Sequence, residues 1–590
     1  LLKNETLKKK VRTKIKPLLI NKKISSWNIT DGKCEKYIIN SFLLSLICFI
    51  RVKVYQRINF NDALVRLSAM FSKFKSAIVN AVRGSDGLDY VGNQKNTTTT
   101  TTNSKYEYTR PSFLNFSDEK VNAASDTEMR PLILPRDVEF PFKAGYCECI
   151  NAGKSKLNED QGAVWRRKLT PKWWANMPKE SLEANEDNVN KLETDAFDVK
   201  DPSLTYTVFA IFDGHGGPMV AVIAAKELES ILHEKLENVA DILIPNTNSY
   251  EGDVQFQRGG MKYQVDFRKP VNASQVIVGA LETSFIEMDK RIGEDKENYE
   301  VKGGCTALVV LFILGKVYTA CAGDSRAIVA VGDRVEPLSR DHTPTSERVR
   351  ICNVGYQKSF LLKNDYTSFE YYRRPTSQDL GKPVLYRHPE GLGYSYRTIG
   401  PDDLKLPLIS GTGKRARLMG TIGVTRGFGD HELKALGSLV MIKPFLSAMP
   451  EIRVLDITKL SLAAADVIIM GSDGLFDVTE NGQAVNAVRT SFKKMMNENK
   501  GKTTLSPTSD DKQYMCAAQD LVNYARGKPS TENRSWKKSD GNPASGDDIT
   551  AWVIPLLPYL KEHESWCLKT ITDDVPGSLK ASNVTTNNNN

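Results

Sequence analysis

Five short segments of the sequence share a pattern that could do chemistry. In each, a strand-like hydrophobic run meets an acidic residue beside small or turn-forming residues. The acids are Glu159 and Asp160 in "NED", Asp213 in "FDGHGG", Asp324 in "CAGDSRA", Asp473 in "MGSDGLFD", and Asp547 and Asp548 in "SGDDIT". One Asp-Gly after a strand is usually a plain turn. Five such segments in one chain are hard to explain as turns.

Carboxylates that gather at one place repel each other, so they stay ionised together only if cations hold them. Oxygen-only ligation suits Mg²⁺ or Mn²⁺, and the absence of cysteine or clustered histidine ligands argues against zinc. A pair of such ions can generate hydroxide and stabilise both ends of a displacement at phosphorus. His215, two residues after Asp213, could protonate the departing alkoxide. The pattern therefore predicts metal-dependent phosphate ester hydrolysis.

The elements that must position these acids are short hydrophobic runs and longer helix-like stretches. Strand-like runs include "TYTVFAIF", "TALVVLFIL", "KVYTACAG", "RAIVAVG" and "DVIIMGSDG", and "LFILGKVYTACAG" indicates a hairpin turning at Gly315-Lys316. Helices are expected over 218–243, 274–292 and 482–498. Residues 165–203 indicate a loop insertion, and residues 343–418 a long excursion between strands. The fold class expected is α+β, with mostly antiparallel sheets and helices packed outside.

Composition and hydrophobic pattern divide the chain into four parts. Residues 131–560 read as the globular domain, and residues 561–590, which end in "NNNN", as a disordered tail. Residues 70–130 read as a short basic amphipathic helix, with Phe74 on its apolar face, followed by a disordered linker. Residues 1–69 precede the first methionine and are a doubtful extension, interpreted as a translated upstream region with a genuine membrane anchor as the alternative.

Charge and cysteine content limit the partners. The net charge is +9, but residues 1–69 hold 15 Lys/Arg against 4 Asp/Glu, so the remaining residues carry 9 − 11 = −2. Because these remaining residues have no excess of Lys and Arg over Asp and Glu, they are not expected to bind nucleic acid. Nine cysteines without a CxxC pair indicate reduced thiols and a cytoplasmic location. The basic helix over residues 70–84 predicts peripheral contact with an internal membrane surface.

The motifs together resemble a known family. "FAIFDGHGG", "GGCTALVV", "AGDSRAI", "DHTP", "GTIGVTRGFGD", "SDGLFDV" and "GDDIT" occur in the order found in the metal-dependent serine/threonine protein phosphatases, the PPM or PP2C-type family. The resemblance covers roughly residues 131–555. It implies a four-layer αββα sandwich of two antiparallel sheets flanked by helices. The excursion at about 343–418 is similar to the flap insertion of one sub-branch.

The resemblance also implies roles at the matching positions. Asp213 would bridge two metal ions, with Asp473 and Asp547 completing one metal site. Glu159 and the Gly214 carbonyl would serve the other, with Asp160 close by through water. Asp324 would contribute to a weaker third site, and His215 would be the general acid. The implied cofactors are two Mg²⁺ or Mn²⁺ ions, and the implied partners are phosphorylated proteins.

Two positions depart from the family's pattern or leave it ambiguous. Many relatives place a phosphate-binding arginine four residues before the glutamate, where this chain has Ser155 between Lys154 and Lys156. Lys154 is the expected phosphate contact, acting as a point charge without a bidentate fork. Either of the adjacent acids Asp547 and Asp548 could bind metal, and the motif alignment favours Asp547.

Two other functions compete with an active phosphatase. One is a binding module that keeps the fold and has little or no catalytic activity. It is disfavoured because each ligand position is acidic and His215 is present. The other is a different metal-dependent phosphohydrolase, such as a nuclease, which the charge of the body disfavours.

Overall fold

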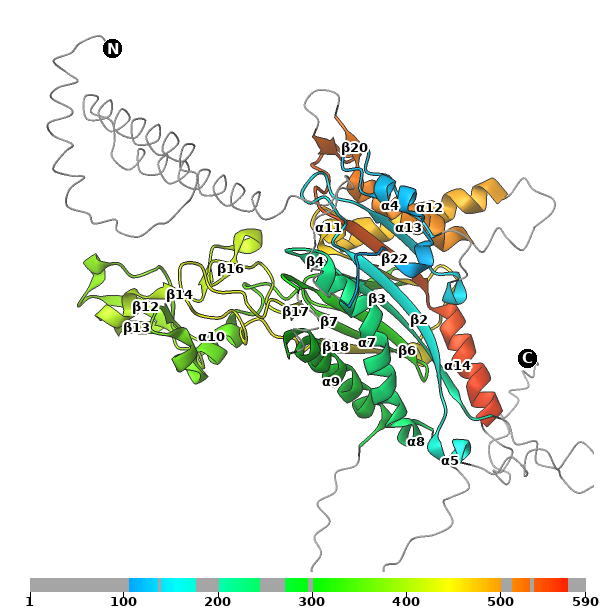
Figure 1. The fold of residues 1–590 in the computed structure, drawn as a ribbon, viewed down its shortest axis with the longest axis horizontal. Helices are drawn as coiled ribbons and strands as arrows, with labels where there is room; N and C mark the ends of the chain where they lie inside the picture. Colours follow the sequence, from blue (N-terminus) through cyan, green and yellow to red (C-terminus); the bar gives the residue numbers. More distant parts are fainter. Residues whose placement is uncertain are drawn as a thin grey trace, which may run out of the picture. The chain divides into compact units, whose positions relative to one another are not determined.

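A computed structural model of the chain describes residues 105–135, 140–176, 201–244, 271–294, 301–499, 512–530 and 535–570. Two antiparallel sheets of five strands each form its centre (Figure 1). The first sheet, in spatial order, is β1 (Gly145–Cys149), β22 (Ile549–Pro555), β19 (Val467–Gly471), β8 (Arg326–Val331) and β9 (Arg334–Pro337). The second is β18 (Glu451–Asp456), β7 (Lys316–Ala322), β6 (Ala307–Ile313), β3 (Leu204–Phe212) and β2 (Gln161–Leu169).

Alternation along β3 shows how the sheets are layered. Successive side chains of a strand point to opposite faces. Val208 and Ala210 join the hydrophobic cluster that contains helices α7 and α9. Phe209 and Ile211 join a different cluster, in which they pack with Trp552 of the first sheet. The expected hairpin between β6 and β7 is also present, with its turn at Leu314-Gly315.

Helices cover the outer face of each sheet. Helices α7 (Met219–Glu237) and α9 (Ala273–Glu294) pack on the second sheet. Helices α12 (Asn481–Asn499) and α13 (Gln513–Arg526) pack on the first. The order helix, sheet, sheet, helix confirms the expected four-layer sandwich (Figure 1). The three helices expected from the sequence are present within a few residues of their expected ends, the first of them continuing after a break as α8 (Ala240–Leu243).

Three expectations about irregular segments are wrong. Residues 105–130, expected as linker, contain a 3-10 turn and helix α4 (Asp118–Ala124), and Leu114 within them is fully buried against Tyr146 and Trp552. Residues 165–169, expected as loop, complete β2, where Trp165 is buried. The parts of these predictions at 70–104 and 177–200, like residues 1–69, lie outside the described residues.

The third correction is at the C-terminal end, where helix α14 (Leu557–Thr570) continues ten residues past the expected boundary. Tyr559 stacks on Phe312, with ring centroids 3.8 Å apart. The Trp566 indole N–H donates to the Pro202 carbonyl at 3.2 Å. These contacts hold the helix against the second sheet, while residues 571–590 lie outside the described part of the chain.

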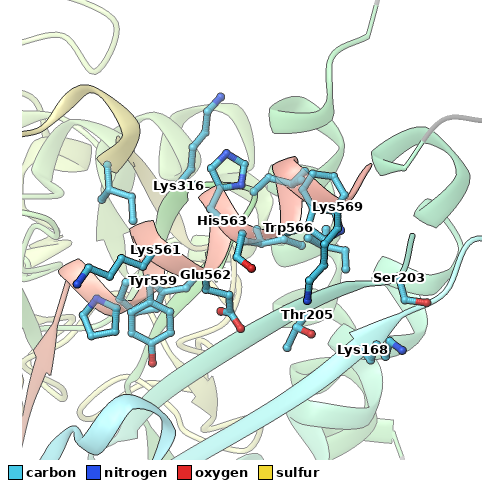
Figure 2. A pocket seen from close by; sticks show the side chains of 18 of the residues that line it. Lys168, Ser203, Thr205, Lys316, Tyr559, Lys561, Glu562, His563, Trp566 and Lys569 are labelled. Atoms are coloured by element: carbon cyan, nitrogen blue, oxygen red, sulfur yellow. The ribbon is translucent and has the colours of Figure 1, made fainter. Parts of the chain in front are cut away.

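A cavity of about 750 Å³ lies beside α14, and Figure 2 shows its lining. It is lined by the start of β3, including Thr205, by the β6–β7 turn and by α14. Two ion pairs, Lys168 with Asp201 and Arg166 with Glu562, lie at its margin. Asp213 follows the other end of β3, a strand of nine residues that spans roughly 30 Å. The cavity is therefore remote from the carboxylates.

The flap has its own hydrophobic core. It contains α10 (Arg348–Gln357) and small strands, and Figure 1 shows it extending from the sandwich next to β17 (Phe428–Gly429). Its buried residues, which run from Ile351 to Leu446, form a cluster of their own. The packed unit therefore continues beyond the expected end at residue 418. Its strands are β10 (Tyr366–Thr367), β11 (Glu370–Tyr371), β12 (Pro383–Arg387), β13 (Ser395–Thr398), β14 (Leu406–Pro407), β15 (Ile409–Ser410) and β16 (Arg417–Leu418).

The remaining elements are short. They are α5 (Lys172–Ala175), α8 (Ala240–Leu243), α11 (Asp473–Phe476), β4 (Gly214–His215), β5 (Gly304–Cys305), β17 (Phe428–Gly429), β20 (Lys528–Pro529) and β21 (Trp536–Lys537). Strands β17, β5 and β4 form a small antiparallel sheet. Within the described ranges, no helix is long and apolar enough to cross a membrane.

Candidate active site

Three aspartates from both sheets meet at the strand ends. Asp213 follows β3 and Asp324 follows β7, both in the second sheet, while Asp473 follows β19 of the first sheet and opens α11. One carboxylate oxygen from each lies within 4.8 Å of the other two. The main-chain N–H of Asp473 also donates to Asp213 Oδ2 at 3.3 Å. The sandwich thus brings together acids that are more than one hundred residues apart in sequence.

Burial and mutual repulsion raise the pKa values of this cluster. Burial is the largest cause for Asp213, followed by the Asp473, Asp160 and Asp324 carboxylates, and together they hold its pKa well above the ordinary range. The pKa of Asp324 is raised in the same way. Burial and Asp547 raise the pKa of Asp473 to about 6. Cations would relieve both effects, because they restore the stabilisation that the ionised carboxylates lose with water.

The loop between β1 and β2 brings Glu159 and Asp160 to the same region. A Cβ atom on Gly214 would lie 2.4 Å from the Glu159 carbonyl oxygen, so the two backbones meet closely and position 214 has no room for a side chain. Asp160 is 1% exposed, and its Oδ2 atom has no hydrogen-bond partner among the described residues. A buried carboxylate oxygen without a donor fits a site completed by a cation or its water ligands.

The structure separates the roles of the two adjacent acids before β22. Asp548 accepts hydrogen bonds from the Asn151 main-chain N–H at 2.7 Å, the Asn151 side chain at 3.0 Å and the Glu159 N–H at 2.9 Å. It therefore joins two loops. The Asp547 carboxylate instead contacts the ammonium group of Lys154. This arrangement favours Asp547 as the ligand.

Lys154 lies beside the carboxylates, as its expected role requires. Burial alone would lower its pKa, but the carboxylates of Asp547, Asp473 and Asp213 raise it above the ordinary range. The ammonium group therefore stays charged at neutral pH. Ser155 stands at the position of the family's arginine, but its hydroxyl donates to the Leu157 carbonyl within the same loop.

His215 has a partner that the sequence reasoning did not assign. Its Nε2 atom lies 2.7 Å from Oδ2 of Asp430, whose side chain is 4% exposed. Asp430 follows β17 and has a left-handed backbone, with φ of 56°. Its main-chain N–H donates to the Gly303 carbonyl at 2.8 Å, next to β5. The small sheet of β4, β5 and β17 thus fixes the carboxylate against the imidazole.

A signal for Asp430 was present in the sequence. "GFGD" shows the same pattern as the five acidic segments, an acid after a small residue at a strand end. The sequence reasoning also missed two buried arginines, Arg110 and Arg130, because they lie in the stretch expected as linker. No local pattern marks those two as part of a site, since the contacts that tie them to the site are with the main-chain carbonyls of Asp160 and Asp547, far away in sequence.

Comparisons with known proteins decide the family. The model of the family described as "Protein phosphatase 2C" matches residues 181–360 and 409–534. "Protein phosphatase 1H" of Xenopus tropicalis is 36% identical over 526 residues, covering 82% of this chain and 99% of that protein. The chain belongs to the protein phosphatase 2C family.

Two other relatives, both protein phosphatases by name, agree with this assignment. "Protein phosphatase 1H" of Homo sapiens is 35% identical, covering 83% of this chain and 99% of that protein. "Protein phosphatase 1J" of Mus musculus is 35% identical, covering 79% of this chain and 89% of that protein. A serine-threonine phosphatase 2C structure from Toxoplasma gondii aligns with a TM-score of 0.34 and 16% identity, over 72% of this chain and 99% of that one.

Membership gives the activity and marks the insertion. The chain is a protein serine/threonine phosphatase of the 2C family. The two stretches matched by the protein phosphatase 2C model leave out residues 361–408, which lie within the flap. Residues 361–408 are therefore an insertion relative to the family model, whereas the rest of the flap lies within the matched stretches.

Proposed function

We propose that this chain hydrolyses phosphoserine and phosphothreonine on protein substrates with the help of two Mg²⁺ or Mn²⁺ ions. The observation that carries the proposal is the meeting of Asp213, Asp324 and Asp473, whose oxygens lie within 4.8 Å of one another. All donors at this place are oxygens, which suits Mg²⁺ or Mn²⁺. The unpartnered Oδ2 of Asp160 beside them supports the same proposal.

The roles follow the resemblance and the geometry. Asp213, Asp473 and Asp547 would hold one ion, and Asp213 together with Glu159 and the Gly214 carbonyl would hold the other. Asp160 would act through water, and Asp324 would contribute to a weaker third site. When bound, the ions would supply a hydroxide nucleophile at neutral pH and neutralise charge on the phosphate.

The chain's own residues bind the substrate and move one proton. Lys154 attracts the phosphate to the cluster as a point charge. His215 donates its transferable proton to the departing serine or threonine oxygen. Asp430 holds Nε2 of that ring, 2.7 Å away. Nδ1 is therefore the nitrogen available for the proton transfer.

Turnover of p-nitrophenyl phosphate with and without Mn²⁺ tests the proposal. We expect activity that a chelator removes and added Mn²⁺ restores. Asp213→Ala should lose about three orders of magnitude or more, because one side chain serves both ions. Metal-independent turnover at the wild-type rate would contradict the two-metal mechanism. Absence of turnover in a folded wild-type chain would instead favour the inactive binding module.

The proposal extends to partners and location. We place the enzyme in the cytoplasm, acting in signalling on phosphoproteins and not on nucleic acid. Residues 70–84 are proposed to contact an internal membrane surface, and they lie outside the described residues. The flap is proposed to select protein substrates, since aromatic and arginine side chains such as Tyr372 and Arg374 are exposed on it.

A further inference from the structure

Two arginines ahead of the first strand are buried at the site. Residues 105–130, here named the strap, precede the sandwich in sequence. Arg110 is 6% exposed and Arg130 is fully buried. Burying an arginine is costly unless its donors are satisfied. The groups that accept hydrogen bonds from the two arginines therefore indicate the role of these residues.

Arg110 holds the loop that carries Glu159 and Asp160. Its Nη1 atom donates to the Asn158 carbonyl at 3.2 Å and to the Asp160 carbonyl at 2.9 Å. Its Nε atom donates to Glu148 of β1 at 2.9 Å, which balances the buried charge. The arginine thus connects a rigid strand to the main chain on both sides of Glu159.

Arg130 holds the loop that carries Asp547. Its guanidinium group donates to the Ser545 carbonyl at 2.6 Å and to the Asp547 carbonyl at 3.0 Å. The Nε atom donates to the Ile150 carbonyl at 2.8 Å. Among the described residues its hydrogen-bond acceptors are all main-chain carbonyls. These contacts therefore hold the guanidinium group and the loop together without forming an ion pair.

A third connection links the two loops. Asp548, next to Asp547, accepts from the Glu159 main-chain N–H at 2.9 Å. The strap, the loop at 158–160 and the loop at 545–548 form one closed network beneath the carboxylates. We propose that the strap is a positioning element of the metal site, and that Arg110 and Arg130 set the affinity for the metal ions. This inference rests on the proposed two-metal function.

The physical reason is the repulsion among the carboxylates. Asp213, Asp324 and Asp473 bring carboxylate oxygens within 4.8 Å of one another, and the loops at 158–160 and 545–548, joined by the bond from the Glu159 N–H to Asp548, add further acids beside them. Like charges this close repel, so loops that were free to move would spread apart before a metal binds. Donors fixed on the carbonyls of Asp160 and Asp547 oppose that spreading without occupying a ligand atom. Residues that orient metal ligands in this way typically contribute about 10- to 100-fold in metal affinity.

Direct Mn²⁺ binding by the full chain tests the inference. Bound Mn²⁺ is measured by electron paramagnetic resonance or calorimetry, without substrate. We expect Arg130→Met to raise the Mn²⁺ dissociation constant about 10- to 100-fold. Arg130→Lys, which keeps the charge but not the planar fork, should show a smaller rise in the same direction.

The matched control is Arg350 of the flap. It too donates to two main-chain carbonyls, those of Thr425 at 2.9 Å and Phe445 at 3.1 Å, and neither belongs to a ligand loop. Arg350 also pairs with Glu347, so its loss removes an ion pair in addition to the two carbonyl contacts. Arg350→Met should lower the thermal stability of the chain but leave the Mn²⁺ dissociation constant within twofold of wild type. An equal rise for both variants would mean that general destabilisation, not positioning, weakens the site, and would overturn the inference.

Wild-type hydrogen exchange keeps the inference testable if the variants do not fold. Coupling between two sites is reciprocal, so Mn²⁺ must stabilise the strap if the strap stabilises the Mn²⁺ site. Saturating Mn²⁺ should slow amide exchange in peptides from residues 105–130 more than in peptides from the flap core. Equal exchange in the strap with and without bound Mn²⁺ would overturn the inference. If the wild-type chain binds no Mn²⁺, the proposed two-metal function fails first.

Discussion

Replacing Asp430 by asparagine should impair the enzyme according to the leaving group. The change keeps the shape of the side chain but removes the carboxylate that lies 2.7 Å from His215 Nε2. The partner is buried, with 4% of its side chain exposed, so water cannot take its place. Asparagine offers His215 at most a neutral hydrogen bond, so the ring loses the charged partner that fixes it and stabilises its protonated form.

The size of the effect follows from that hydrogen bond. Hydrogen bonds to charged groups contribute about 1.5–3 kcal/mol. At about 1.4 kcal/mol for each tenfold change in rate, full loss in the transition state corresponds to roughly 10- to 150-fold. We expect kcat on a phosphoserine peptide to fall by this factor in Asp430→Asn. Turnover of p-nitrophenyl phosphate should fall much less, because p-nitrophenolate departs with little need of a proton.

A second His–Asp pair supplies the control. Asp289 on α9 lies 3.1 Å from His431 Nε2, contacts Lys443 and accepts from the Gly429 N–H of β17 at 2.9 Å, but it does not touch His215. Asparagine at position 289 keeps an oxygen that can accept from Gly429, so the change removes the charge without freeing β17. Asp289→Asn should lower stability while leaving the ratio of peptide to p-nitrophenyl phosphate activity unchanged. The reasoning is refuted if Asp430→Asn slows both substrates equally. It is also refuted if the change costs the full factor again in a His215→Ala background, where no proton donor remains to be positioned.

Three further outcomes are expected. Burial alone would raise the pKa of Glu347, but two neighbouring arginines lower it to about 2 from its ordinary 4.5, so the ionised carboxylate stabilises the fold fully above pH 4.5 and less and less as pH falls toward 2. In urea unfolding, the wild-type chain should therefore have a larger free energy of unfolding than Glu347→Gln at pH 7, and the difference should shrink steadily below pH 4.5. A difference that does not change with pH would disprove the assignment. Exchanging residues 361–408 with those of a distant relative should change protein-substrate preference but leave p-nitrophenyl phosphate turnover near normal; unchanged preference would reject substrate selection by the flap. A fluorescent fusion of residues 70–90 should bind anionic vesicles at low salt and be released by Phe74→Glu; a fusion that stays in solution would dismiss the membrane contact.

Local patterns in the sequence were sufficient for the main strands and helices and for the acids at strand ends, whereas the four-layer order was expected only from the family resemblance. Runs such as "TYTVFAIF" carry the buried character of a strand in their own composition, and β3 covers that whole run and begins one residue before it. Asp213 and Asp473 could be found because an acid beside glycine at the end of such a run is a local pattern. Each of these predictions used only residues that are adjacent or nearly adjacent in the sequence.

What the sequence did not reveal depends on distant contacts. Arg130 looks like an ordinary polar residue in a linker until its acceptors at Ser545 and Asp547, more than four hundred residues away, are known. Trp165 opens a charged stretch that resembles a loop, yet pairing with β3 makes it part of a strand. The length of α14 was underestimated because its polar residues hide the contacts of Tyr559 and Trp566 with the second sheet.

The separate core of the flap has a consequence for how the protein unfolds. Leu418 and Phe445 pack within the flap's own cluster and not between the two sheets. Opening of that cluster can therefore occur while the sandwich keeps its hydrophobic contacts, as a local transition with its own free energy. The chain then has two cooperative units in one catalytic domain. A substitution within the flap core therefore alters the stability of the flap, whereas the clustered carboxylates belong to the sandwich.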